Sequence, residues 1–181
     1  MTHAMRRRIG FWLVMAFSAA GVSVRGAESL RIVPIVSQDQ VVVSFELADA
    51  YTDEVREALA SGLRTTFTYD VELRMAVPAW MDRTVAAAVV TISAQYDNLT
   101  RRHTLSRTVD GRVEESLVTD DETLVEGWLT ALSRMPLCDT SRLDPNRDYY
   151  VRIRARARPS SSSLIGWVGS ITGQANFTFI P

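Results

Sequence analysis

Cysteine, histidine and lysine are scarce in this sequence. Its 181 residues include one cysteine, Cys138, and two histidines, and all 20 of its basic residues are arginine. A lone cysteine cannot form an internal disulfide, so the fold has to be stabilised by a packed core. Two histidines are too few for a histidine-rich metal site. With 21 acidic residues, the formal net charge is −1, which argues against a nucleic-acid-binding protein.

The first 27 residues have the layout of a secretory signal peptide. Three arginines at positions 6–8 precede the apolar run Ile9–Ala20, and small residues follow as far as Ala27. We therefore expect residues 1–27 to be a signal peptide and residues 28–181 to form a single β-rich domain. Because a membrane-spanning helix needs about 20 apolar residues, a periplasmic or secreted location is favoured. Membrane anchoring by an uncleaved signal is the alternative.

The type of basic residue and the charge of the mature domain indicate the source of the protein and its partners. Exclusive use of arginine is typical of a GC-rich bacterial genome, in which the exported compartment is the cell envelope. Without the leader, 16 basic residues stand against 21 acidic residues, so the mature domain is mildly acidic. We expect no nucleic acid among its partners.

Most of the remaining chain has the patterns of β-strands. Apolar side chains recur at every second residue in Val41–Leu47, Phe67–Met75 and Tyr149–Ala157. Arg83–Tyr96 is apolar on both faces in its middle, which predicts a central strand covered on both sides. About seven or eight strands are expected, without strand–helix–strand alternation. The prediction is a mainly β, antiparallel, β-sandwich-like domain with two short helices packed on it.

The first helix is predicted from its capping residues. Thr52 can cap a helix whose first turn carries Asp53 and Glu54, the charges that a helix N-terminus favours. Gly62 is predicted to end this helix in the left-handed conformation, after which the chain continues as a strand. Gly62 is therefore expected to be a structural residue.

The second helix is predicted from a capping box and an apolar stripe. Thr119 and Glu122 have the spacing of the capping box. Leu124, Trp128 and Leu132 form the stripe that is expected to face the core.

One short motif favours a sandwich. The stretch LDPNRDY, Leu143–Tyr149, resembles the tyrosine corner of immunoglobulin-like and fibronectin-like sandwiches, in which the tyrosine hydroxyl bonds backbone a few residues upstream. Asn146 replaces the glycine of that motif, and asparagine tolerates left-handed φ. The motif predicts that the Tyr149 hydroxyl bonds the backbone of the preceding turn.

Four stretches together resemble a bacterial exported family, domain of unknown function 4390. They are EALASGLRTTFTYDVELR, AWMD, YDNLTRRHTL and DYYVRIRARA, which spread over most of the mature chain. The resemblance implies an envelope location and one domain. It implies no activity, ligand or catalytic residue.

The sequence offers no catalytic constellation. His103, the one histidine outside the leader, falls within a predicted strand, where we expect it on a solvated face. A serine triad would need it, but Ser106 lies on the opposite strand face. Asp144–Asp148 resembles the start of a calcium loop, yet Tyr149 stands where that loop requires glycine. We predict a protein that is not an enzyme and has no catalytic residues, metal or cofactor.

One surface has a definite chemical character. Four arginines alternate with apolar residues in the last predicted long strand and share one of its faces; we call Arg152, Arg154, Arg156 and Arg158 the arginine row. Acidic residues of neighbouring strands can pair with the row and give a solvated, salt-bridged face; the candidates are Asp70, Glu72, Glu114 and Glu115. Alternatively, the row binds an anionic partner, such as lipid head groups, phosphorylated glycans or an acidic patch on another envelope protein.

Two functions from different classes remain open. The first is an uncharacterised, exported, non-enzymatic interaction domain that binds another envelope protein or an anionic surface. The second is a small-ligand or lipid-binding module with an apolar cavity between the sheet and the helix that carries Trp128. The sequence does not determine the oligomeric state.

Overall fold

The computed structural model describes residues 29–159 and 170–179; the predicted leader lies outside them. Nine strands and two α-helices occur in the described residues, which confirms the mainly β prediction with one strand more than expected. In chain order they are β1 (Leu30–Ser37), β2 (Gln40–Leu47), α1 (Asp53–Ala60), β3 (Thr65–Met75), β4 (Arg83–Asp97), β5 (Arg102–Val109), β6 (Arg112–Thr119), α2 (Glu122–Thr130), β7 (Ala131–Asp139), β8 (Tyr149–Pro159) and β9 (Ile171–Phe177). A 3₁₀ turn, Thr140–Arg142, follows β7.

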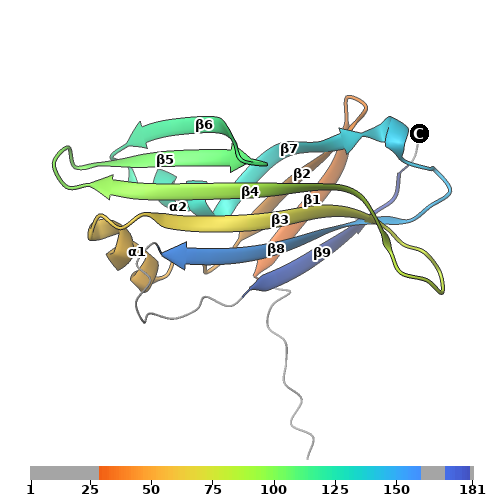
Figure 1. The fold of residues 1–181 in the computed structure, drawn as a ribbon, viewed down its shortest axis with the longest axis horizontal. Coiled ribbons are helices and arrows are strands. Elements are labelled where there is room, and N and C mark those ends of the chain that lie inside the picture. Colours follow the sequence, from red (N-terminus) through yellow and green to blue (C-terminus); the bar gives the residue numbers. More distant parts are fainter. Residues whose placement is uncertain (1–28, 160–169, 180–181) are drawn as a thin grey trace, which may run out of the picture.

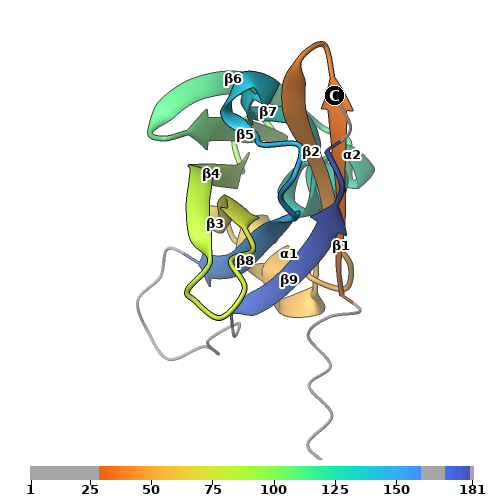
Figure 2. The same ribbon diagram turned by 90° about the vertical axis from the view of Figure 1, so that its right-hand side faces the viewer.

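The strands form two antiparallel sheets around one core. A three-stranded sheet has the order β1-β2-β7 and a six-stranded sheet the order β6-β5-β4-β3-β8-β9 (Figure 1). Viewed along the long axis, the two sheets surround the interior (Figure 2). Phe45 of β2 meets Tyr69 of β3 across it, with ring centroids 4.6 Å apart. At Gly173 of β9, a Cβ would lie 3.2 Å from Leu30 of β1, so glycine allows the sheet edges to approach closely.

In the long strands, buried apolar side chains alternate with more exposed ones. In β3, Phe67, Tyr69 and Val71 are fully buried while the residues between them are half-exposed. The prediction that β4 is covered on both sides is wrong, because Ala87 and Val89 are exposed on its outer face. Small apolar residues tolerate either environment, so their run did not reveal that one face is open.

Helix α1 begins and ends as predicted. The Thr52 hydroxyl accepts a hydrogen bond from the Val55 N–H at 3.4 Å. Gly62 has a φ of +83°. The Gly62 N–H donates to the Leu59 carbonyl at 2.8 Å and the Leu63 N–H to the Ala58 carbonyl at 3.1 Å, the pair of bonds that defines a Schellman motif. Glycine therefore redirects the chain from α1 into β3.

Helix α2 differs from its prediction at both ends. Its N-cap is Asp121, whose carboxylate accepts hydrogen bonds from the N–H groups of Thr123 at 2.9 Å and Leu124 at 3.3 Å. Thr119 instead accepts a hydrogen bond from the Asp121 N–H at 3.1 Å. The helix ends at Thr130 because the next residues pair with β2 as the edge strand β7. Leu132 therefore belongs to a strand, and tertiary pairing overrides the helical spacing.

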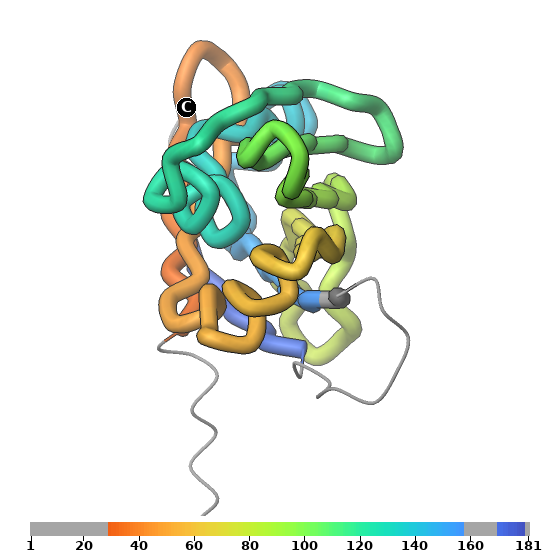
Figure 3. Tube along the Cα trace, turned by 90° about the vertical axis from the view of Figure 1, so that its left-hand side faces the viewer, coloured from red at the N-terminus to blue at the C-terminus, as the bar shows by residue number. Residues whose placement is uncertain are grey.

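Both helices lie at the same end of the molecule (Figures 1 and 3). The Tyr69 hydroxyl of β3 donates to the Leu129 carbonyl of α2 at 2.6 Å. The Trp128 ring is buried and lies 4.2 Å from the guanidinium carbon of Arg107 on β5. Leu124 of the predicted stripe is exposed. Together these contacts fix α2 against the six-stranded sheet.

The tyrosine-corner prediction is confirmed. The buried Tyr149 hydroxyl accepts a hydrogen bond from the Asp144 N–H at 2.7 Å. The left-handed conformation expected of Asn146 is absent: its φ is not positive, and its N–H donates to the Asp144 carboxylate at 2.9 Å. An Asx turn thus takes the place of the glycine conformation.

We expect Tyr149→Phe to lower the free energy of unfolding by about 1 kcal/mol or somewhat more, because the Asp144 N–H loses its acceptor. Urea denaturation of the two proteins measures this difference. Stability within error of the wild type would show that the hydrogen bond does not stabilise the corner.

Candidate interaction surface

Pairing of β3 with β8 positions the arginine row. The antiparallel register places Glu72 opposite Arg152 and Asp70 opposite Arg154. Further along, Arg156 and Arg158 lie opposite Thr68 and Thr66. The side chain of Arg158 lies outside the described residues. The row therefore runs beside the polar face of β3.

Two arginines of the row are paired with acidic residues of β3. Arg152 Nη2 lies 2.6 Å from Glu72 Oε2, and Arg156 Nη2 lies 2.6 Å from Asp70 Oδ2. Glu115, another predicted partner, instead pairs with Arg107 at 2.8 Å. The salt-bridged interpretation thus describes two members of the row.

Arg154 differs from its neighbours. Asp70 lies directly opposite it, but the Asp70 carboxylate accepts a diagonal hydrogen bond from Arg156. Arg154 is exposed and has no ion-pair or hydrogen-bond partner among the described residues. The guanidinium of Arg154 is therefore available to an anion from outside the molecule.

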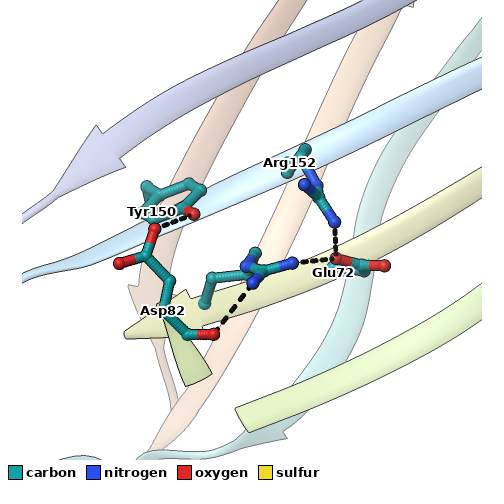
Figure 4. A network of polar contacts seen from close by, with 5 residues as sticks. Glu72, Asp82, Tyr150 and Arg152 are labelled. Carbon is teal, nitrogen blue, oxygen red and sulfur yellow. Dashed lines mark hydrogen bonds and ion pairs between the residues drawn. The ribbon is translucent and has the colours of Figure 1, made fainter. Parts of the chain in front are cut away.

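A hydrogen-bond network fixes the end of the row that is nearest to the β3–β4 loop (Figure 4). Glu72 accepts from Arg74 at 3.2 Å as well as from Arg152. Arg74 also donates to the backbone carbonyl of Asp82 at 2.8 Å, and the Tyr150 hydroxyl donates to the Asp82 carboxylate at 2.6 Å. Sequence reasoning missed Asp82 and Tyr150 because their contact joins segments 68 positions apart.

The network keeps both of its carboxyl groups charged. Burial raises the pKa of Glu72, but the hydrogen bonds and charges of Arg152 and Arg74 outweigh it and hold that pKa below its usual value. The hydrogen bond from Tyr150 and that from the Val77 N–H lower the pKa of Asp82. The same bond to Asp82 raises the pKa of Tyr150, whose hydroxyl therefore stays a donor.

A shallow hollow of about 180 Å³ lies beside Arg154. Ala87 and Val89, exposed on the outer face of β4, line it together with their sheet partners Glu72 and Asp70. Small apolar side chains thus lie next to an unpaired guanidinium. The Asp70 and Glu72 carboxylates that also line the hollow are paired with Arg156 and Arg152, so the Arg154 guanidinium is the group there that can bind an acidic side chain.

Comparison with known proteins assigns the family. The model described as "Domain of unknown function (DUF4390)" matches residues 25–165. The chain belongs to the DUF4390 family. The matched part of this DUF4390 protein includes both helices and every strand from β1 to β8, whereas β9 lies beyond it. No curated protein and no solved structure matches the chain.

The histidine of this DUF4390 protein does not lie where we expected. His103 is only 6% exposed, so its prediction as a residue of a solvated face is wrong. It points inward because it shares one face of β5 with the buried Leu105, and the Tyr96 ring lies 4.8 Å from it. Ser106 is on the opposite face, as expected. In residues 29–159 and 170–179 no group of three or more histidine, cysteine or acidic side chains could hold a metal ion.

The region between α2 and the sheet is packed with side chains. Val125, Trp128 and Leu129 are buried in the same core cluster as Tyr69. A larger hollow of about 600 Å³ lies elsewhere, in the polar surroundings of Gly62 and Asn98. No helix of the described part is long and apolar enough to cross a membrane.

Proposed function

We propose that this protein is a non-enzymatic interaction domain of the bacterial cell envelope, exported by the leader at residues 1–27, which binds an acidic patch on another envelope protein through Arg154. The observation that carries the proposal is the exposed guanidinium of Arg154, which has no partner among the described residues. The leader pattern supports the location.

The surroundings of Arg154 support binding of a carboxylate. This face carries four guanidinium groups and three carboxylates, so one positive charge is in excess; the groups are those of Arg74, Arg152, Arg154 and Arg156 and those of Asp70, Glu72 and Asp82. Hydrogen bonds to Glu72 and Asp70 fix Arg152 and Arg156, the members of the row on either side of Arg154. In a chain of net charge −1, this local excess favours an acidic partner surface.

A non-enzymatic role agrees with the position of the one described histidine. His103 is buried beneath Tyr96, and Ser106 faces away from it. A proton-transfer pair that reaches solvent would need both side chains on one exposed face. The packed core beside Trp128 gives no support to the ligand-cavity hypothesis.

We expect Arg154→Glu to abolish capture of the partner while changing the melting temperature little, because substitution of an unpaired surface residue has a small effect on stability. In-cell cross-linking followed by mass spectrometry compares the wild type with Arg152→Glu and Arg154→Glu. Arg112→Glu, an exposed arginine on β6, is the matched control and should retain the partner.

Identical cross-linked partners in all four proteins would contradict the proposal. Salt provides a second test. We expect added salt to weaken capture of the partner, because attraction to an exposed guanidinium is screened over a length of about 10 Å at 0.1 M salt. Binding to phosphatidylglycerol vesicles that depends on Arg154, in the absence of a protein cross-link, would assign the surface to lipid instead.

A further inference from the structure

The loop between β3 and β4 displays two large apolar side chains to solvent. Trp80 is 78% exposed and Met81 is 81% exposed. The loop protrudes at the end of the molecule opposite to the helices (Figure 1). Tryptophan and methionine are both enriched in the centres of protein interfaces. Their display together on a protruding loop indicates a contact surface.

The loop is held in one conformation by its last residue. The Asp82 carboxylate accepts hydrogen bonds from the Val77 N–H at 3.3 Å and from the Tyr150 hydroxyl at 2.6 Å. The Asp82 carbonyl accepts from Arg74 at 2.8 Å, and the Trp80 N–H donates to the Val77 carbonyl at 3.2 Å. A tip that is ordered before binding loses little entropy on binding.

A hollow of about 590 Å³ lies directly beside this loop. Tyr149, Tyr150 and Phe177 line it, and more polar residues complete its wall and rim: Asp148, Asn176 and Thr178. Ala76, at the base of the loop, also lines the hollow, so the apolar tip and the aromatic hollow are neighbours on one surface. The exposure of Trp80 shows that the tip does not fill the hollow of its own molecule.

We propose that two copies of this chain associate through a two-fold contact in which the Trp80–Met81 tip of each copy enters the hollow beside Tyr149 and Phe177 of the other. A two-fold axis between neighbouring tip and hollow forms both contacts at once and closes the assembly as a dimer. The partly exposed rings of Tyr150 and Phe177 offer the apolar tip contacts within a lining that also presents polar groups.

Charges at the edge of the contact are complementary as well. Arg83 follows the tip and is exposed, and Asp148 lies exposed at the rim of the hollow. In the proposed dimer, Arg83 of each copy comes next to Asp148 of the other, which favours this register over others. Arg154 is not among the residues that line this hollow, so the variants at Trp80 test self-association separately from the proposed function.

Sedimentation velocity of the purified full chain over a range of concentrations tests the dimer. We expect Trp80→Ala to weaken dimerisation by about 30-fold or more, as for a central interface anchor, with an unchanged melting temperature at concentrations where both proteins are monomeric. Leu99→Ala is the matched control, since Leu99 is 95% exposed on the β4–β5 loop and should leave the dimer intact. A monomer at every concentration, or a dimer indifferent to Trp80→Ala, overturns the proposal.

Disulfide trapping identifies the contact directly. In a Cys138→Ser background, a Met81→Cys protein is mixed with a Thr178→Cys protein under oxidising conditions. We expect a mixed disulfide between the two, and none when Leu99→Cys replaces Met81→Cys. Absence of the mixed disulfide contradicts self-association. A monomer whose Trp80 mediates binding to phosphatidylglycerol vesicles also contradicts it and assigns the tip to a lipid surface.

Discussion

Tyr69→Phe is expected to lower the free energy of unfolding by about 2 kcal/mol, although it removes a single oxygen atom. The Tyr69 hydroxyl is fully buried and donates to the Leu129 carbonyl at 2.6 Å. That carbonyl belongs to the last turn of α2, where backbone acceptors lack partners within the helix. Burial raises the pKa of Tyr69, so the hydroxyl remains a donor. Its removal leaves a buried carbonyl without a hydrogen bond.

Urea denaturation measures this effect, with Tyr51→Phe as the matched control. Tyr51 is half-buried, and its hydroxyl has no hydrogen-bond partner among the described residues. We expect that substitution to change stability by less than about 0.5 kcal/mol. If Tyr69→Phe and Tyr51→Phe were equally stable, the bond to α2 would not contribute to the fold.

Gly62→Val is expected to destabilise the protein by about 2 to 3 kcal/mol, because valine at positive φ is strained. Gly62 has a φ of +83°, and a Cβ there would lie 3.0 Å from Asn98 Nδ2 and 3.5 Å from the Tyr96 carbonyl oxygen. Thermal denaturation of the variant should show an earlier transition than that of the wild type.

Gly111 provides the matched control for Gly62. It has a φ of +80°, but a Cβ there would meet nothing within 4 Å. Gly111→Val should therefore show the backbone strain alone and cost less than Gly62→Val. Addition of Asn98→Ala should relieve only the variant at Gly62. Equal losses at both glycines would show that the contact with Asn98 has no energetic consequence.

Features with local causes could be predicted from the sequence. Alternation in β3 follows from side chains that point to opposite faces of a strand, and the ends of α1 follow from Thr52 and Gly62. The bond of Tyr149 spans five positions, so a short motif contains both of its partners. The arginine row is likewise visible as an alternation within one strand.

Features that depend on distant partners could not be predicted. Strand β7 exists because β2, about 90 positions earlier, pairs with it, and its own residues also fit a helix end. The polarity of His103 predicts exposure, whereas its side chain is buried. Asp70 lies opposite Arg154 but pairs with Arg156, which is diagonal to it, and this pairing leaves Arg154 without a partner among the described residues. No pattern within one strand contains that information.

The proposed role of Arg154 can be tested at Ala87, which lines the shallow hollow beside Arg154. A photo-reactive amino acid at Ala87, exposed beside Arg154, should form an adduct with a partner protein in living cells. We predict that Arg154→Glu abolishes this adduct, that Arg112→Glu leaves it intact, and that the same probe at exposed Glu114 on β6 gives none. Absence of an adduct at Ala87, or an adduct of unchanged yield in Arg154→Glu, would contradict an interaction domain that binds through this surface.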